Sequence, residues 1–191
     1  MDFINSLGKY ISDLSLSEKN AIEFLESIFR EKSLYIFSDM KNTLQNPAFH
    51  GEGDVYTHTL LVCKELTRIP AFTRLPIRQK SELLLAALLH DIGKLGVPEA
   101  ILNKPAKLTD EEWEIMKKHP AIGKNLLKPL KSFEPIYDWI LYHHERADGK
   151  GYYNKDYSEV PLAARLIAVA DTYSAITMRR SYKSPKTHED A

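Results

Sequence analysis

Residues 81–91 of the chain read Ser81-Glu-Leu-Leu-Leu-Ala-Ala-Leu-Leu-His90-Asp91, and Leu83 to Leu89 within them form the longest apolar stretch. This stretch predicts a deeply buried helix over Ile77 to Asp91 that ends at Gly93. An unpaired carboxylate at the end of such a helix would be costly to bury, whereas a metal-bound carboxylate would not. The position of Asp91 therefore predicts a partner for its side chain.

Apolar residues recur with helical spacing almost throughout the chain, and no internal repeat interrupts them, so the sequence predicts an all-α fold. Capping boxes at Ser15-x-x-Glu18 and Thr109-x-x-Glu112 mark two helix starts. The helix after Thr109 should end or bend near His119-Pro120. The expected helices cover residues 18–32, 34–44, 55–67, 77–91, 121–127, 135–145 and 161–177.

The composition is that of an ordinary soluble protein, with 26 Lys+Arg against 26 Asp+Glu and 43% hydrophobic residues. A protein that coats nucleic acid would be more basic, so we expect no nucleic-acid polymer as partner. The apolar stretches are shorter than the roughly 18 residues that span a bilayer, and the N-terminus lacks the features of a signal peptide. We therefore expect a cytoplasmic protein without a membrane partner. The single cysteine, Cys63, permits no internal disulfide.

Histidines recur at intervals of 24 to 32 residues along successive predicted helices, as His58, His90, His119, His143 and His144. Asp171 interrupts an apolar run over residues 166–170, where little water would solvate an anion. Helical bundles build internal metal sites from ligands on facing helices. A single histidine is usually an ordinary hydrogen-bonded residue, but five histidines together with Asp91 and Asp171 predict a metal centre.

Imidazole and carboxylate donors without thiolate suit iron, manganese, zinc or a similar divalent ion. Iron or manganese is our first expectation, with zinc, nickel or cobalt as alternatives. Seven ligands are too many for one tetrahedral centre, so two ions that share a carboxylate fit better. Such a pair activates a bridging water and clamps the oxygens of an in-line phosphoryl displacement, which predicts phosphoester hydrolysis. Lys94, four residues beyond His90, can reach the same pocket as a cation for the phosphate or an acid for the leaving oxygen. The alternative for Lys94 is a solvated surface lysine.

Several motifs follow one another in an order and spacing that resemble the HD-GYP family of the HD phosphohydrolase superfamily. They cover about residues 55–183 and read His90-Asp-Ile-Gly-Lys94-Leu-Gly-Val-Pro98, Leu108-Thr-x-Glu-Glu-Trp113-x-x-Met-Lys-x-His119-Pro, His143-His-Glu-Arg-x-Asp-Gly-x-Gly-Tyr152 and Pro161-Leu-x-Ala-Arg165-Leu-Ile-Ala-Val-Ala-Asp171. The resemblance implies an HD-domain-type helical bundle over residues 51–191, preceded by a short helical extension over residues 1–50. It also implies a metal-dependent phosphodiesterase that opens cyclic di-GMP to pGpG or GMP.

The resemblance also implies roles for individual residues. By position, one metal is held by His58, His90, Asp91 and Asp171, and the next by Asp91, His119, His143 and His144, so that Asp91 bridges the two. Lys94 matches the family lysine that serves the phosphate or the leaving group, which makes Asp91 and Lys94 the catalytic pair. Arg180 and Lys183 lie in a segment similar to the family's Arg-Pro-Tyr-Arg and are implied to contact the substrate phosphates. The alternative for these two is a solvated basic tail.

Asp54 stands four residues before His58, so on a helix both side chains would share a face and could hold one ion. In trinuclear relatives an acidic residue occupies the matching position, which implies a third metal here. The alternative interpretation is a helix N-cap just after Gly53. The sequence therefore predicts two or three divalent ions and leaves the role of Asp54 open.

The chain departs from the family pattern in two places. The motif Gly151-Tyr152-Tyr153 replaces Gly-Tyr-Pro, which removes the fixed φ of proline. The hydroxyl of Ser174 replaces a carboxylate three residues after Asp171, close to a metal ligand.

Three functions therefore stay open. They are hydrolysis of cyclic di-GMP, hydrolysis of another nucleotide or cyclic phosphoester, and non-catalytic binding of metal and dinucleotide in a signalling module. The partner implied by the first function is a cyclic dinucleotide substrate. A homodimer through the amphipathic stretch 18–32, or a separate signalling partner, is also left open.

Overall fold

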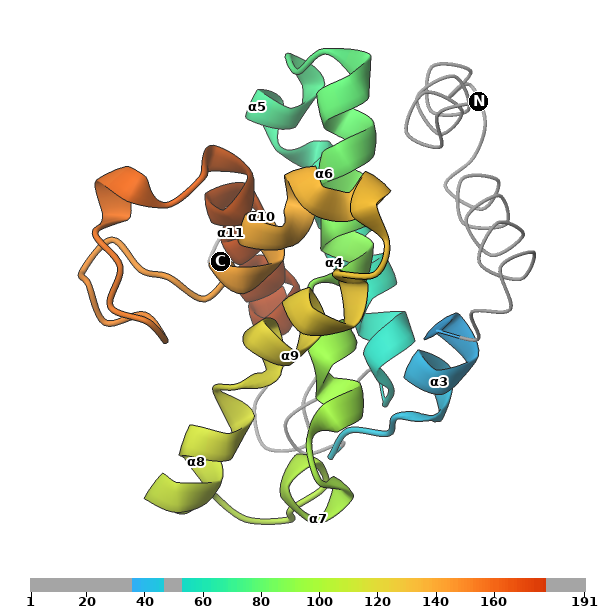
Figure 1. The fold of residues 1–191 in the computed structure, drawn as a ribbon, viewed down its shortest axis with the longest axis vertical. Coiled ribbons are helices and arrows are strands. Elements are labelled where there is room, and N and C mark those ends of the chain that lie inside the picture. The colour runs from blue at the N-terminus through green and yellow to red at the C-terminus, as the bar shows by residue number, and fades with distance from the viewer. Residues whose placement is uncertain (1–35, 47–52, 178–191) are drawn as a thin grey trace.

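The computed structural model describes residues 36–46 and 53–177. Within these ranges, all of the regular secondary-structure elements are helices. The expected all-α fold is confirmed (Figure 1). The α-helices are α3 (Ile36–Asn42), α4 (Val55–Arg68), α5 (Pro70–Thr73), α6 (Ile77–Leu89), α7 (Glu99–Leu102), α8 (Asp110–Met116), α9 (His119–Leu127), α10 (Tyr137–Leu141) and α11 (Leu162–Thr177). Three 3₁₀ helices, η1 (Ile92–Gly96), η2 (Lys131–Ile136) and η3 (Tyr157–Glu159), join them.

Helix α6 forms the centre of the bundle, with α4, α10 and α11 packed around it (Figure 1). It is apolar on most of its circumference, and Leu83, Leu85, Leu88 and Leu89 are each at most 1% exposed. A helix that is apolar all round must be covered on all sides, which explains its central place. The predicted burial is confirmed, but the helix ends at Leu89, with His90 as its C-cap, and the chain continues as η1. His90 and Asp91 therefore lie at the point where the central helix gives way to a tighter turn.

The connection between α8 and α9 places a histidine at a helix start. Helix α8 begins with the predicted capping box, in which Thr109 Oγ1 accepts from Glu112 N and the Glu112 carboxylate accepts from Thr109 N. The helix ends at Met116, and α9 begins at His119 with Pro120 in its first turn, where a missing N–H is tolerated. The predicted break near His119-Pro120 is confirmed.

The prediction of one helix over residues 135–145 was wrong. The 3₁₀ helix η2 leads into α10, and α10 ends at Leu141, so His143 and His144 follow the helix end. The side chain of Glu145 is buried and accepts two backbone N–H groups from residues 153 and 155, which draws the chain out of the helical path. Helices α5 and α7 were not predicted, because four residues show no periodicity that sequence alone can reveal.

Several predictions fall outside the described residues: the helix over 18–32, the boundary near residue 50, and the segment with Arg180 and Lys183. Within 36–46, α3 packs against α4 and η1, so this part of the predicted extension lies on the same bundle. In the described ranges, every helix is too short or too polar to cross a lipid bilayer.

Candidate metal centre

The seven predicted ligands come from five places in the fold, and the structure brings all of them together. His58 lies on α4, His90 and Asp91 at the end of α6, and Asp171 on α11. His119 begins α9, and His143 and His144 follow α10. Their donor atoms form two groups, each within 4.8 Å: Asp91 with His119, His143 and His144, and His58 with His90 and Asp171. These are the two groups that the sequence motifs imply, apart from the place of Asp91.

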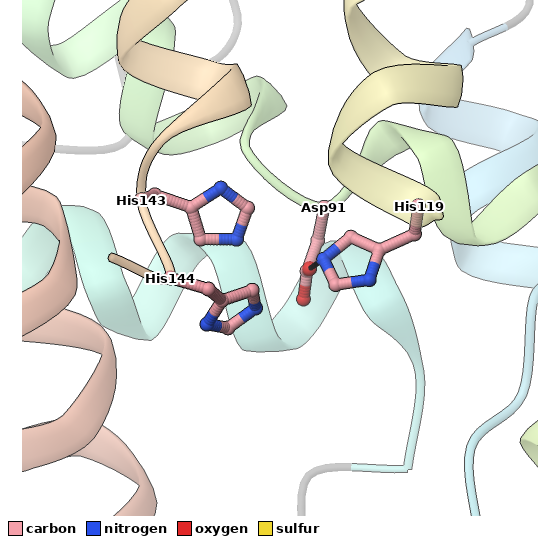
Figure 2. A group of neighbouring side chains, drawn as sticks. All are labelled: Asp91, His119, His143 and His144. Carbon is pink, nitrogen blue, oxygen red and sulfur yellow. Dashed lines mark ion pairs between the residues drawn. The ribbon is translucent and has the colours of Figure 1, made fainter. Parts of the chain in front are cut away.

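Asp91 lies between the two groups and turns one carboxylate oxygen toward each. Its Oδ2 is 3.6 Å from Nε2 of both His58 and His90. Its Oδ1 is 3.2 Å from Nε2 of His119, and Figure 2 shows His119 and the pair His143 and His144 on either side of it. One carboxylate that faces two donor groups has the geometry of a bridging ligand.

Three of the histidines are held by the same local contact. Nδ1 of His90, His119 and His143 lies 2.6, 2.9 and 2.6 Å from the backbone carbonyl oxygen three residues earlier. A carbonyl can only accept, so Nδ1 carries the proton and donates, which leaves the lone pair on Nε2. A backbone carbonyl of this kind orients metal-binding histidines in many proteins.

The Nε2 atoms of these three histidines are buried and have no hydrogen-bond partner within the described ranges, and the same holds for Asp91 Oδ1. With Nδ1 protonated, Nε2 of His119 and Oδ1 of Asp91 are two acceptors that face each other at 3.2 Å. Two buried acceptors at this distance repel each other unless a cation lies between them. The residues present therefore fit a divalent metal ion, since nitrogen and oxygen donors converge and four of the donor atoms lack another partner within the described ranges.

Burial keeps the imidazoles neutral, whereas neighbouring groups keep the carboxylates charged. Burial is the main cause that lowers the pKa of His90 and His143, and it lowers the pKa of His144 to about 3. Burial opposes the charge of Asp91, but the ammonium of Lys94 and the His90 ring more than offset it and hold the pKa well below its usual range. Neutral imidazole and charged carboxylate are the forms that bind metal.

We expect the metal-free protein to lose stability as the pH falls below about 6.5. The unfolded chain binds protons on its histidines near pH 6.5, whereas His144 in the folded chain does so only near pH 3. Between these values the unfolded state binds more protons, so the free energy of unfolding rises with pH. Urea unfolding of chelator-treated protein at several pH values measures this slope.

Aspartates contribute little to this pH dependence above pH 5, because unfolded aspartates titrate near 3.9. A His144→Phe variant serves as control, since it should show a smaller slope between pH 5 and pH 6.5. A urea midpoint that stays constant from pH 7 to pH 5 would contradict the neutral, buried imidazoles.

With this geometry established, comparison with known proteins identifies the fold family. A family model described as "HD domain" matches residues 46–191. The chain belongs to the HD domain family. The predicted metal chemistry thus agrees with the family, because an HD domain binds divalent metal.

Curated relatives of this HD domain carry the names of cyclic-dinucleotide hydrolases. Cyclic di-GMP phosphodiesterase PA4108 of Pseudomonas aeruginosa is 42% identical over 130 residues, 67% of this chain and 31% of that protein. The cyclic di-GMP phosphodiesterase of Thermotoga maritima is 38% identical over 194 residues, 99% of this chain and 50% of that protein. The 3'3'-cGAMP-specific phosphodiesterase 2 of Vibrio cholerae is 40% identical over 107 residues, 54% of this chain and 20% of that protein. The chain spans half or less of the length of these relatives.

Lys94 lies inside the HD domain site, so the alternative of a solvated lysine was wrong. Its side chain is buried, and Nζ is 2.7 Å from Asp91 Oδ2. It also donates to Gln45 Oε1 at 2.8 Å. The ammonium therefore neutralises part of the negative charge beside the donor groups and lines the adjoining pocket.

Asp54 is the N-cap of α4, as the second interpretation of this residue expected. Its Oδ1 accepts from Thr57 N and its Oδ2 from Thr57 Oγ1, both at 2.8 Å. Both carboxylate oxygens thus serve the first turn of the helix, and Asp54 belongs to neither donor group. This geometry supports two ions rather than three.

A pocket of about 460 Å³ opens on the donor groups and extends to α7 and α8. Its walls include residues that the sequence analysis did not select, namely Leu102, Lys104, Lys107, Trp113 and Tyr152. The Tyr152 ring packs against the His144 ring in a tilted arrangement at 4.4 Å between centroids and meets Trp113 edge to face at 5.7 Å. The pocket therefore combines an aromatic wall with three lysines, Lys94, Lys104 and Lys107, which suits a ligand with both a base and a phosphate. Trp113 and Tyr152 both belong to the family motifs, and this was the signal that could have revealed the wall.

Gly93 allows a close approach between η1 and the start of α9. A Cβ atom at this position would lie 1.7 Å from the His119 carbonyl oxygen and 2.6 Å from the Gly123 nitrogen. The backbone of η1 can therefore touch the start of α9 only because residue 93 has no side chain. This close approach brings Asp91 to His119.

The loop with Gly151-Tyr152-Tyr153 is tied to Glu145, which explains one departure from the family. The amide of Tyr153 donates to Glu145 Oε1 at 2.7 Å, and the amide of Lys155 donates to Oε2 at 2.8 Å. A proline at position 153 has no N–H to donate. The tyrosine thus supplies a hydrogen bond to a buried carboxylate that the family's proline could not make.

We expect Tyr153→Pro, which restores the Gly-Tyr-Pro motif, to destabilise this protein. The substitution removes one of the two backbone N–H groups that donate to the Glu145 carboxylate, and such a loss costs about 1–3 kcal/mol. Urea unfolding measures the change. The control is Tyr153→Phe, which keeps the amide and should cost less. A proline variant as stable as the parent would show that the loop does not depend on this hydrogen bond.

Proposed function

We propose that this HD domain is a metal-dependent phosphodiesterase that hydrolyses cyclic di-GMP. The observation that carries the proposal is a set of three buried imidazoles, His90, His119 and His143. Backbone carbonyls fix the tautomer of each ring, and their Nε2 atoms lie near Asp91 without a hydrogen-bond partner among the described residues. Two divalent ions held there would supply an activated water and neutralise charge on a phosphate. The names of the curated relatives support the substrate.

Individual residues of the chain have different roles in this proposal. Asp91 and Asp171 supply negative charge that holds cations in a buried site, and the imidazoles complete the two donor groups. The buried ammonium of Lys94 contributes a positive donor at the pocket wall for a phosphate oxygen or the leaving oxygen. We assign Lys104 and Lys107 to further phosphate contacts and the Trp113 ring to contact with a base, since all three line the pocket. Arg180 and Lys183 remain part of the proposal as substrate contacts.

Iron or manganese is the proposed metal, and a donor set of nitrogen and oxygen without thiolate is compatible with both. Zinc, nickel and cobalt accept the same donors and are outcomes of the test. A cytoplasmic site of action also belongs to the proposal, in keeping with a sequence whose single cysteine, Cys63, permits no internal disulfide.

The second candidate is hydrolysis of another cyclic dinucleotide or cyclic phosphoester. Two observations favour it. The loop beside the site has Gly151-Tyr152-Tyr153, and Tyr152 lines the pocket. The Vibrio cholerae relative is named for 3'3'-cGAMP rather than cyclic di-GMP.

The test combines metal analysis with turnover. Protein purified without chelator should contain two metal ions per chain and hydrolyse cyclic di-GMP faster than 3'3'-cGAMP, 2',3'-cyclic nucleotides and bis(p-nitrophenyl) phosphate. Chelator should abolish turnover, and reconstitution with Fe²⁺ or Mn²⁺ should restore it. Faster turnover of another compound would select the second candidate. Single-turnover inactivity of protein that holds two ions would instead indicate a binding module.

A further inference from the structure

One residue outside the motifs touches the candidate catalytic lysine. Gln45 lies between α3 and α4, is 2% exposed, and accepts a hydrogen bond from Lys94 Nζ through its Oε1 at 2.8 Å. The two residues are 49 positions apart in the chain. Gln45 also lies one residue before the stretch that the HD family model matches.

The backbone holds Gln45 in place from both sides. Gln45 N donates to Gly53 O at 2.9 Å, and Val55 N donates to Thr43 O at 3.1 Å, so residues 43–45 pair with the residues that precede α4. Helix α3 packs against α4 and η1, with Met40 fully buried. The amide side chain is therefore presented to η1, the element that carries Lys94, by a fixed segment.

The contact restricts the direction of the ammonium group. A lysine ammonium has three donors, of which one reaches Asp91 Oδ2 at 2.7 Å and one reaches Gln45 Oε1. With a single partner the ammonium could turn about that bond, whereas two partners fix the direction of the third N–H. Among the described residues Lys94 Nζ has these two partners, and Lys94 lines the pocket, so the third donor can serve a ligand there.

Packing alone does not explain an amide at this position. The Nε2 atom of Gln45 is buried and has no hydrogen-bond partner within the described residues. A methionine of similar length would fill the same volume without leaving a buried donor unpaired. The contact that the amide makes through its oxygen, with Lys94, is the one that a methionine would lose.

We propose that Gln45 is a positioning residue that holds Lys94 in its reactive direction, so that a segment before the matched HD region completes the site. This inference rests on the proposed phosphodiesterase function. It assigns no direct contact between Gln45 and the substrate. Gln45 acts through Lys94.

The first experiment compares Gln45→Met with Leu44→Ala, a control at the neighbouring position whose side chain is 57% exposed. In metal-loaded full-length protein, Gln45→Met should lower kcat for cyclic di-GMP by about 10- to 100-fold, since misplacement of a catalytic group has effects of this order. KM and metal content should stay near the parent values, and Leu44→Ala should behave like the parent. Gln45→Glu, which keeps an acceptor, should retain more activity than Gln45→Met. Parent-like kcat in Gln45→Met would overturn the inference.

A double-mutant cycle separates positioning from a structural role. If Gln45 acts through Lys94, adding Gln45→Met to a Lys94→Met variant should change kcat by less than about 2-fold, because the two effects are coupled. A general loss of structure would instead multiply the two effects. Multiplicative loss overturns the inference.

A third measurement does not depend on substrate. In isotope-labelled, metal-free protein, the Nζ resonance of Lys94, assigned by its loss in Lys94→Arg, should shift in Gln45→Met and stay unchanged in Leu44→Ala. An Nζ resonance that does not respond to Gln45→Met overturns the contact itself. If the Nζ resonance shifts in Gln45→Met but the parent protein does not hydrolyse cyclic di-GMP, the contact is supported and the proposed substrate is rejected. The two failures are therefore distinguishable.

Discussion

Replacing Asp91 by alanine should remove both metal ions and lower kcat/KM for cyclic di-GMP by on the order of 10³-fold or more. Asp91 Oδ2 faces His58 and His90, and Asp91 Oδ1 faces His119. One substitution therefore takes a ligand from both donor groups. Elemental analysis of protein purified without chelator, with turnover measured on the same sample, tests this expectation.

His58→Ala is the matched control, because His58 belongs to one donor group only. It should weaken the binding of one ion and leave the binding of the other unchanged, so that about one ion per chain remains. Asp91→Asn provides a second variant that keeps the size of the buried side chain, and circular dichroism verifies the fold of each protein. An Asp91→Ala protein that retains a full ion per chain would show that the carboxylate does not bridge.

Lys94→Met should keep both metal ions and lose turnover, with kcat reduced by about 10²- to 10⁴-fold, the range typical of a general acid or base. The ammonium is buried beside Asp91 and lines the pocket, but it is not a metal donor. Its loss should therefore affect the reaction more than metal binding. Metal content and steady-state kinetics measured together distinguish the two.

The control for Lys94→Met is Lys128→Met, which removes a positive charge from an exposed position outside the pocket. It should leave both kcat and metal content unchanged. If Lys94→Met lost its ions as well as its activity, Lys94 would be a residue that holds the metal site together. Unchanged kcat would return Lys94 to a structural role.

The sequence predicted those parts of the site whose signal is local or repeated. The apolar stretch 83–89 predicted a buried helix. The recurrence of histidines along successive predicted helices indicated that several helices contribute metal donors. The capping box at Thr109 and the break before His119 follow from chemistry within four residues. Each of these features can be recognised without knowing which distant segments meet.

Other features depend on contacts between distant residues, which a single sequence does not reveal. The hydrogen bond between Lys94 and Gln45 joins positions 49 apart, and nothing around Gln45 marks it as special. Asp54 four residues before His58 fits both a ligand and an N-cap, and only the contacts with Thr57 separate the two. The end of α10 at Leu141 was missed because the buried contact of Glu145 with a later loop shortens the helix.

The spread of the donor residues along the chain has a consequence for the protein in a cell. The two donor groups join residues from His58 to Asp171, so they exist together only in the complete native bundle. Ions that bind the native chain and not the unfolded chain stabilise it by mass action. Starvation for metal would therefore enlarge the unfolded fraction and expose it to proteolysis. The amount of this protein should then report the supply of metal in the cell, independently of any change in its synthesis.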